Sequence, residues 1–303
     1  MSDMRVNLCG ITLKNPVITA SGTFGYGMEY QEFYPISRLG GISCKGTTLK
    51  ERPGNPAPRI AETPAGMLNS VGLQNPGVDT FLNTYLPWLK QQDTVVIANI
   101  AGNTLEDYAA MAERLSDSAV DMVELNISCP NVKQGGVNFG TSCDSVAEVT
   151  RLVKRHCAKP LMVKLTPNVT SIGDIAASAE AAGADMLSLI NTLTGMRIDI
   201  RTRRPILHNN TGGLSGPAVF PVAVRMVREV YKRVSVPVIG MGGISTWEDA
   251  AEMMIAGAAA VQVGTASFHD PYACIRIIEG LEKFAQRSGL HSITELTGTL
   301  QEW

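Results

Sequence analysis

Eight short apolar segments recur along the chain, and none alternates with polar residues as a half-exposed strand would. In chain order they are Val17–Ser21, Gly41–Lys45, Val95–Ala101, Met122–Asn126, Leu161–Leu165, Met186–Ile190, Val236–Gly240 and Ala260–Gly264. Strands that are apolar on both faces are typical of parallel sheets covered by helices. The pattern therefore predicts an α/β protein with eight parallel strands.

The segments between these runs carry helical signals. Leu105–Leu115 and Ile172–Ala182 place apolar residues at helical spacing, and Ser245–Glu248 has the S-x-x-E pattern of a capping box opening another helix. Gly257 follows that helix and suits a left-handed C-cap. Regular helical crossovers between eight strands predict a closed (β/α)8 TIM barrel and favour it over a doubly wound open sheet.

The length of 303 residues suits one barrel with added loops, because a barrel of this kind needs roughly 250 residues. We therefore expect a single domain over residues 1–303. Val6–Leu8 and Ile11–Leu13 predict an N-terminal β-hairpin. Thr47–Gly77 after the second barrel strand and Asn191–Pro217 after the sixth predict two long loops. Loops that follow barrel strands lie at the C-terminal face, where active sites form.

The composition excludes several classes of partner. The net charge of −2 shows no basic excess for nucleic acid, and no apolar run approaches the roughly 18 residues of a membrane span. The N-terminus has no signal-like apolar core, and the six cysteines contain no C-x-x-C pair for zinc or an iron–sulfur cluster. We expect a cytoplasmic protein with no metal site.

Glycines follow the last two predicted strands. The segments are Val238–Ile244 and Val261–Ala266, and they place Gly242, Gly243 and Gly264 at the C-terminal face. Backbone N–H groups of such glycines can approach a phosphate closely, and these two loops are the usual phosphate site of TIM barrels. The glycines alone leave flavin mononucleotide (FMN), a sugar phosphate and pyridoxal phosphate open.

Chemically active side chains follow other strands. Cys129 comes just after the fourth strand, where a thiol with a pKa near ~8.5 can act as a base once ionised. Lys45 and Lys164 stand at the ends of the second and fifth strands, among apolar residues. A buried lysine requires an anionic partner, so both indicate an anionic ligand, with Glu124 as the alternative internal partner.

Asparagines accompany these residues. Asn99, Asn126 and Asn191 lie at strand ends, and Asn69 lies in the first long loop. An amide offers both donors and acceptors without a titratable charge. The set predicts a site for a flat heterocycle with alternating carbonyl and N–H edges.

Several motifs resemble those of the class 1 dihydroorotate dehydrogenases, and the resemblance covers nearly the whole chain. These motifs are Asn126–Asn131 (NISCPN), Met67–Asn75 (MLNSVGLQN), Asn191-Thr192 and Gly212–Pro217 (GGLSGP). Val132–Gly136 and Gly54–Arg59 resemble the B subtype, the catalytic subunit of the NAD-linked enzyme. Cys129 agrees with class 1, because class 2 enzymes carry serine as the base.

The resemblance implies FMN as cofactor and orotate as ligand. The implied FMN contacts are Ser21, Lys45, Gly46, Asn99, Asn126, Lys164, Ile190, Gly216, Gly242, Gly243, Gly264 and Thr265. The implied orotate contacts are Lys45, Asn69, Ser70, Val71, Gly72, Leu73, Asn126, Asn191 and Thr192. It also implies a partner subunit carrying FAD and a [2Fe–2S] cluster, with a homodimer of catalytic chains inside a heterotetramer.

The function predicted from this resemblance is oxidation of (S)-dihydroorotate to orotate in de novo pyrimidine biosynthesis. Cys129 would be the catalytic base, Lys164 would stabilise the reduced flavin, and Lys45 would help to fix the substrate. The alternatives are a fumarate-linked class 1A enzyme, a flavin enzyme acting on dihydrouracil or dihydrouridine, and a sugar-phosphate isomerase or aldolase without flavin.

Overall fold

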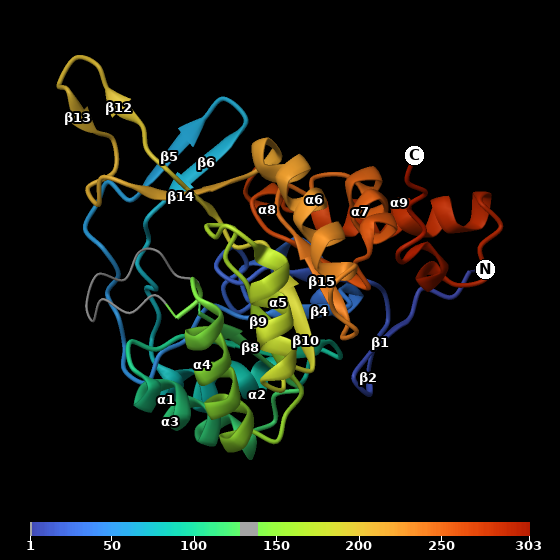
Figure 1. The fold of residues 1–303 in the computed structure, drawn as a ribbon, viewed down its shortest axis with the longest axis horizontal. Helices are drawn as coiled ribbons and strands as arrows, with labels where there is room; N and C mark the ends of the chain where they lie inside the picture. Colours follow the sequence, from blue (N-terminus) through green and yellow to red (C-terminus); the bar gives the residue numbers. More distant parts are fainter. Residues whose placement is uncertain (1, 128–138) are drawn as a thin grey trace.

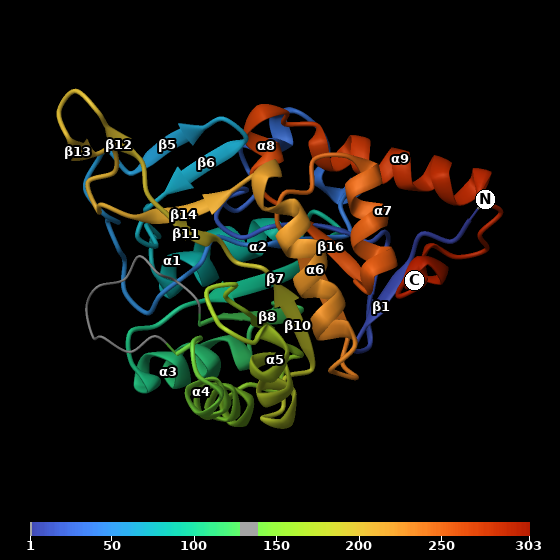
Figure 2. The same cartoon turned by 45° about the horizontal axis from the view of Figure 1, so that its top comes forward.

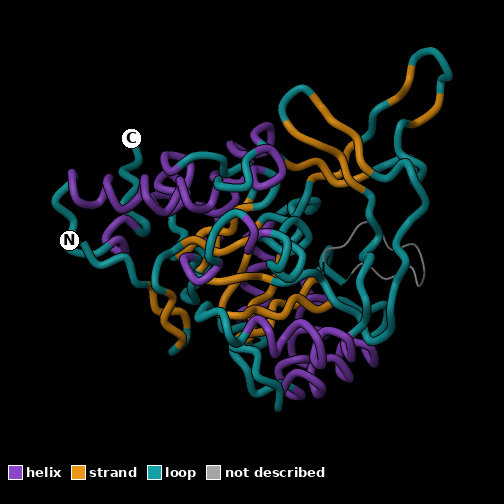
Figure 3. Tube along the Cα trace, turned by 180° about the vertical axis from the view of Figure 1, so that it is seen from behind, coloured by secondary structure: helices purple, strands orange, loops and turns teal. Residues whose placement is uncertain are grey.

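A closed barrel of eight parallel strands forms the centre of the molecule in the computed structural model, which describes residues 2–127 and 139–303. The strands are β3 (Val17–Thr19), β4 (Gly41–Ser43), β7 (Val95–Ile100), β8 (Met122–Asn126), β9 (Leu161–Lys164), β10 (Met186–Leu189), β15 (Val238–Met241) and β16 (Ala260–Val263). Each pairs with the next along the chain, and β16 closes the barrel on β3. The predicted TIM barrel is confirmed, and Figure 3 shows the strands enclosed by helices.

Burial explains why these segments form the barrel wall. Every residue of β8, β9, β10 and β16 is buried, as expected for strands that face side chains on one surface and helices on the other. The predicted start of one strand was wrong, since β15 starts at Val238 and not at Val236. Most of the predicted strands also end one or two residues later than the observed ones, as Val17–Ser21 does against β3. Pro237 has no N–H to donate, so it supplies only its carbonyl oxygen, to the amide of Leu187.

The α-helices surround the barrel. They are α1 (Val78–Thr80), α2 (Leu86–Leu89), α3 (Leu105–Ser116), α4 (Cys143–His156), α5 (Ile172–Ala181), α6 (Phe220–Tyr231), α7 (Trp247–Ala256), α8 (Ala266–His269) and α9 (Ala273–Arg287). A π-helical stretch, Phe81–Tyr85, joins α1 to α2. Between β3 and β4 the chain forms only two 3₁₀ turns, Tyr30–Glu32 and Ile36–Arg38, and α9 packs against β3.

The helix starts follow capping chemistry. The predicted capping box at Ser245–Glu248 is wrong by one residue, because Thr246 is the N-cap of α7. Its hydroxyl accepts from the amide of Asp249, whose carboxylate accepts from the amide of Thr246 in return. The predicted helix end at Gly257 is confirmed, with a φ of 135° that favours glycine.

The predicted N-terminal hairpin is confirmed as β1 (Val6–Leu8) and β2 (Ile11–Leu13). It lies at the N-terminal end of the barrel, because the Sγ of Cys9 is 3.2 Å from the carbonyl oxygen of Asp185, just before β10. The two chain ends lie on the same side of the molecule (Figure 2). The amide of Asp3 donates to the carbonyl of His291, next to the 3₁₀ helix Ile293–Leu296.

The two predicted long connections follow β4 and β10, and both contain short strands. β5 (Ile60–Thr63), β6 (Gly66–Asn69), β14 (Gly212–Ser215) and β11 (Leu193–Gly195) form an antiparallel sheet, here called the upper sheet. β12 (Ile198–Asp199) and β13 (Arg204–Pro205) extend as a separate hairpin, and Pro217–Val219 forms a 3₁₀ turn before α6. Figure 1 shows the upper sheet and this hairpin together on one side of the barrel.

Candidate active site

A cavity of about 570 Å³ lies between the C-terminal end of the barrel and the upper sheet. All eight barrel strands contribute residues at or near their C-terminal ends: Ser21, Lys45, Asn99, Asn126, Lys164, Ile190, Gly242 and Gly264. The upper sheet supplies the opposite wall through Ile60, Ala61, Glu62, Gly66, Met67, Asn69 and Ser215. The cavity is therefore built from segments spread over most of the chain.

The structure brings nearly all of the sequence-predicted site residues to this one cavity. Besides those named above, the predicted residues Gly46, Val71, Gly72, Leu73, Thr192, Gly216, Gly243 and Thr265 line it. Ser70 does not, because it is fully buried beneath the β6 end, where its amide donates to the carbonyl of Arg59. Cys129 lies outside the described residues.

Lys164 is the buried cation of the cavity floor. Only 5% of it is exposed, and its Nζ donates to the hydroxyl of Ser21 at 3.2 Å. Burial opposes ionisation of the nearby Glu124, but the Lys164 charge and hydrogen bonds from several side chains hold the pKa of this carboxyl below its usual range. Glu124 is therefore a carboxylate, and the floor carries one positive and one negative charge.

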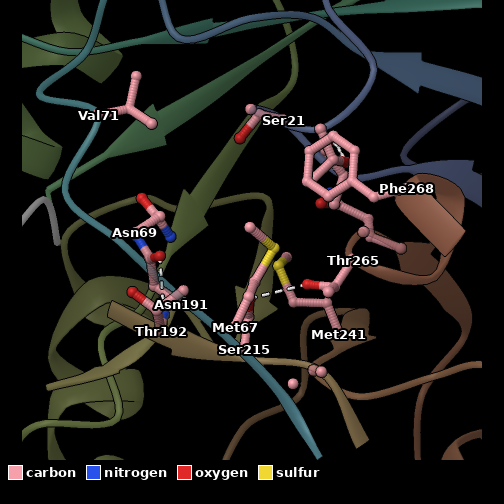
Figure 4. A pocket seen from close by; sticks show the side chains of 18 of the residues that line it. Ser21, Met67, Asn69, Val71, Asn191, Thr192, Ser215, Met241, Thr265 and Phe268 are labelled. Atoms are coloured by element: carbon pink, nitrogen blue, oxygen red, sulfur yellow. Dashed lines mark hydrogen bonds between the residues drawn. The ribbon is translucent and has the colours of Figure 1, made fainter. Parts of the chain in front are cut away.

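The predicted asparagines divide between two places. Asn99 is 1% exposed and donates to Glu124 at the floor, whereas Asn69, Asn191 and Thr192 lie together at one end of the cavity (Figure 4). Asn191 Nδ2 donates to Asn126 Oδ1 at 3.4 Å. This bond links the asparagine-lined end of the cavity to the cavity floor. Such a row of amides can form hydrogen bonds with both the donors and the acceptors on the edge of a planar ring.

Glycines and hydroxyls form the other end. Thr265 Oγ1 donates to Ser215 Oγ at 2.8 Å, as drawn in Figure 4. A Cβ at Gly243, whose φ is 79°, would lie 2.8 Å from the amide nitrogen of Phe220 and 2.9 Å from the carbonyl oxygen of Gly216. Only glycine lets these loops come so close, which leaves a narrow polar recess of the kind that holds phosphate.

Sequence reasoning missed several lining residues, among them Met67, Met241, Gln262, Phe268 and His269. Gln262 had a signal of the same kind as Lys164, since it is a polar residue inside the apolar run Ala260–Gly264. Met67 and Met241 lie in the motif Met67–Asn75 and the segment Val238–Ile244, but the side chains themselves gave no signal, because an apolar residue near a strand end is equally typical of the core.

None of the five described cysteines lines the cavity. Cys44, Cys157 and Cys274 are buried, and Cys9 and Cys143 are exposed elsewhere on the surface. Burial raises the pKa of the Cys44 thiol and so keeps it protonated, although it precedes Lys45. Within residues 2–127 and 139–303, no three His, Cys, Asp or Glu side chains gather to hold a metal ion. In the same part of the chain, no helix has the length and apolarity to cross a membrane.

The fold and the cavity define a TIM-barrel protein with a polar cavity at the C-terminal face of the barrel, where proteins of this fold bind their ligands. The family model for dihydroorotate dehydrogenase matches residues 3–285. The chain is 52% identical to a protein of Petrotoga mobilis over 99% of this chain and 100% of the relative. It is 56% identical to one of Alkaliphilus oremlandii over 98% and 99%, and 53% identical to one of Bacteroides fragilis over 99% and 100%.

All three relatives are named dihydroorotate dehydrogenase B (NAD⁺), catalytic subunit. This chain belongs to the dihydroorotate dehydrogenase family. The resemblance to the B subtype predicted from the motifs is confirmed as well.

Proposed function

We propose that this protein is the catalytic subunit of an NAD⁺-linked dihydroorotate dehydrogenase and oxidises (S)-dihydroorotate to orotate with FMN as its cofactor. The observation that carries the proposal is the convergence of residues predicted for FMN and for orotate on one cavity, from all eight barrel strands. The names of relatives that align over their full length support the same activity.

Two parts of the cavity, the glycine-rich end and the floor, would hold the two ends of FMN. The recess of Gly243, Gly264, Thr265 and Ser215 suits the phosphate, because hydroxyls and close backbone are its usual partners. The buried ammonium of Lys164 suits the pyrimidine end of the flavin, where negative charge collects on reduction. When bound, FMN supplies a two-electron acceptor, chemistry that no side chain can provide.

Residues at the opposite end would hold the substrate. Asn69, Asn191 and Thr192 offer amide and hydroxyl groups to the pyrimidine edge, and Lys45 offers a cation to its carboxylate. Cys129, as a thiolate, would take the proton from C5 while hydride departs from C6, so that the C5–C6 double bond of orotate forms. This role for Cys129 comes from its sequence motif.

A partner subunit would take the electrons onward. We propose that it carries FAD and a [2Fe–2S] cluster, passes electrons to NAD⁺, and joins a homodimer of catalytic chains in a cytoplasmic heterotetramer. The name "catalytic subunit" of the relatives supports the existence of a partner.

The test is to purify the chain and follow its colour and its electron acceptors. Bound FMN absorbs at about 450 nm, and anaerobic addition of dihydroorotate should bleach this band. Turnover with NAD⁺ should require the partner subunit. A colourless protein that gains no flavin on reconstitution would contradict the proposal, and rapid fumarate-dependent turnover by the chain alone would replace it with the class 1A activity.

A further inference from the structure

Glu124 lies directly beneath the cavity and does not line it. It is completely buried on β8, and each carboxylate oxygen accepts two hydrogen bonds. Oε1 accepts from Ser188 Oγ at 2.8 Å and from Gln262 Nε2 at 2.9 Å. Oε2 accepts from Ser43 Oγ at 2.6 Å and from Asn99 Nδ2 at 2.7 Å. The four donors come from β4, β7, β10 and β16, so this one side chain on β8 links five of the eight barrel strands.

These bonds dictate how the two amides are oriented. A carboxylate can only accept, so Asn99 and Gln262 must both turn their NH₂ groups toward Glu124. Their carbonyl oxygens then point away from it, and both are buried without a hydrogen-bond partner among residues 2–127 and 139–303. Asn99 Oδ1 lies on the cavity side, because it would be 2.9 Å from a Cβ placed on the lining residue Gly46.

Two buried acceptors without partners indicate a ligand that brings an N–H group, because such orphaned atoms are costly in a folded protein. Oxidised FMN has one ring N–H, at N3, and it lies on the pyrimidine end that Lys164 suits. The ring N–H groups of orotate are the alternative donors to these two carbonyl oxygens. The floor position of Asn99 and Gln262, each 1% exposed, favours the cofactor.

We propose that Glu124 is a positioning residue that orients the amides of Asn99 and Gln262, so that their carbonyl oxygens accept from the N3–H of FMN. This inference rests on the proposed function, since it takes FMN as the ligand. Glu124 also places a negative charge beside Lys164, which balances the buried ammonium when no flavin is present.

The decisive variant is Glu124→Gln, which keeps the size of the side chain and replaces one acceptor oxygen with NH₂. Whichever oxygen is replaced, one of the two amides loses its acceptor and must rotate, so that it presents NH₂ to the cavity. The apoproteins are titrated with FMN and with N3-methyl-FMN, without any pyrimidine, and flavin fluorescence gives the two dissociation constants.

The wild type should bind FMN at least roughly tenfold more tightly than N3-methyl-FMN, and Glu124→Gln should reduce this ratio by roughly 5- to 10-fold. Glu124→Asp retains the carboxylate and should restore part of the ratio. Ser188→Ala is the matched control, because it removes a donor to Glu124 without touching an amide or a charge. It should lower the melting temperature and keep the wild-type ratio.

A Glu124→Gln protein that folds and keeps the full ratio would overturn the inference, while the proposed function would stand. An unchanged ratio with weaker orotate binding by the FMN-loaded variant would also overturn it and assign the acceptors to the substrate. If the variant does not fold, Gln262→Leu removes one oriented carbonyl directly and must lower the ratio. A wild type that binds no flavin would overturn the proposed function and this inference together.

Discussion

The barrel wall and the upper sheet differ in how they are held together. Wall strands pair with their neighbours in chain order and are buried on both faces, as β7 and β8 show. The upper sheet joins segments far apart in sequence, such as Asn69 opposite Gly213, and much of it stays accessible, with Ile60 58% exposed. The wall is stabilised by apolar burial, whereas the upper sheet depends on backbone pairing across a glycine-rich strand.

This difference separates stability from ligand binding. Deeply buried apolar side chains contribute most of the folding free energy, and nearly all of them lie in the barrel strands and in the helices and connections packed against those strands. The upper sheet and the strand ends contribute the groups that line the cavity. Variants at the two places should therefore fail in different ways.

The largest expected effect is on catalysis without loss of stability. Cys129→Ala should slow reduction of bound flavin by dihydroorotate roughly 10²- to 10⁴-fold, because the base is removed, and FMN should stay bound. Anaerobic stopped-flow absorbance measures the rate. Cys143→Ala, which removes an exposed thiol, is the control and should react at the normal rate. A normal rate in Cys129→Ala as well would remove this residue from the mechanism.

A wall variant should show the opposite result. Ile97→Ala in β7 empties space at a completely buried site and should cost about 2–5 kcal/mol of unfolding free energy. The folded fraction should still bind FMN normally. Ile198→Ala in β12, where the side chain is 55% exposed, should change stability by less than about 0.5 kcal/mol. Equal losses in urea unfolding would contradict the distinction between wall and outer hairpin.

Lys164→Met should affect both stability and ligand binding, because Lys164 belongs to a wall strand and also lines the cavity. Loss of a buried charged donor should weaken FMN binding roughly 10- to 100-fold, measured by fluorescence titration. A variant that purifies with full FMN and normal affinity would contradict this role.

The same variant has a pH signature. The folded-state pKa of Glu124 lies below its ordinary value of 4.5, so its contribution to stability is present above pH 4.5 and is lost as the pH falls through the folded-state pKa. Without the Lys164 charge, burial is less opposed and this pKa rises. Melting temperatures of the apoprotein should therefore begin to fall at a higher pH in Lys164→Met than in the wild type.

The smallest expected effect is in the upper sheet. A Cβ at Gly66 would lie 2.0 Å from the carbonyl oxygen of Ser215, so Gly66→Ala must push β6 away from β14. It should cost about 1–3 kcal/mol and weaken orotate binding while the barrel remains folded. Ala65→Ser, at an exposed neighbouring position, is the control. Isothermal titration calorimetry gives the dissociation constant of orotate for each variant. Equal dissociation constants for Gly66→Ala and Ala65→Ser would contradict the prediction.

The local sequence was sufficient to predict the barrel. Runs such as Leu161–Leu165 are apolar apart from Lys164, and that pattern is typical of a strand covered on both faces. Lys164 could be predicted as a site residue for a related reason, because a charge inside such a run requires a partner. The N-terminal hairpin and the end of α7 at Gly257 were likewise local, since each depends on a few neighbouring residues.

Only the tertiary structure decided what lies above and below the ligand cavity. β6 and β14 show little strand signal of their own, because Gly66, Gly212 and Gly213 are poor strand formers and the pairing joins segments about 140 residues apart. Glu124 could be read from sequence as a carboxylate near Lys164, but not as the acceptor that orients Asn99 and Gln262. Burial can be predicted from the apolar composition of each segment separately. Hydrogen bonds between distant strands form only once the barrel has closed, so no single segment predicts them.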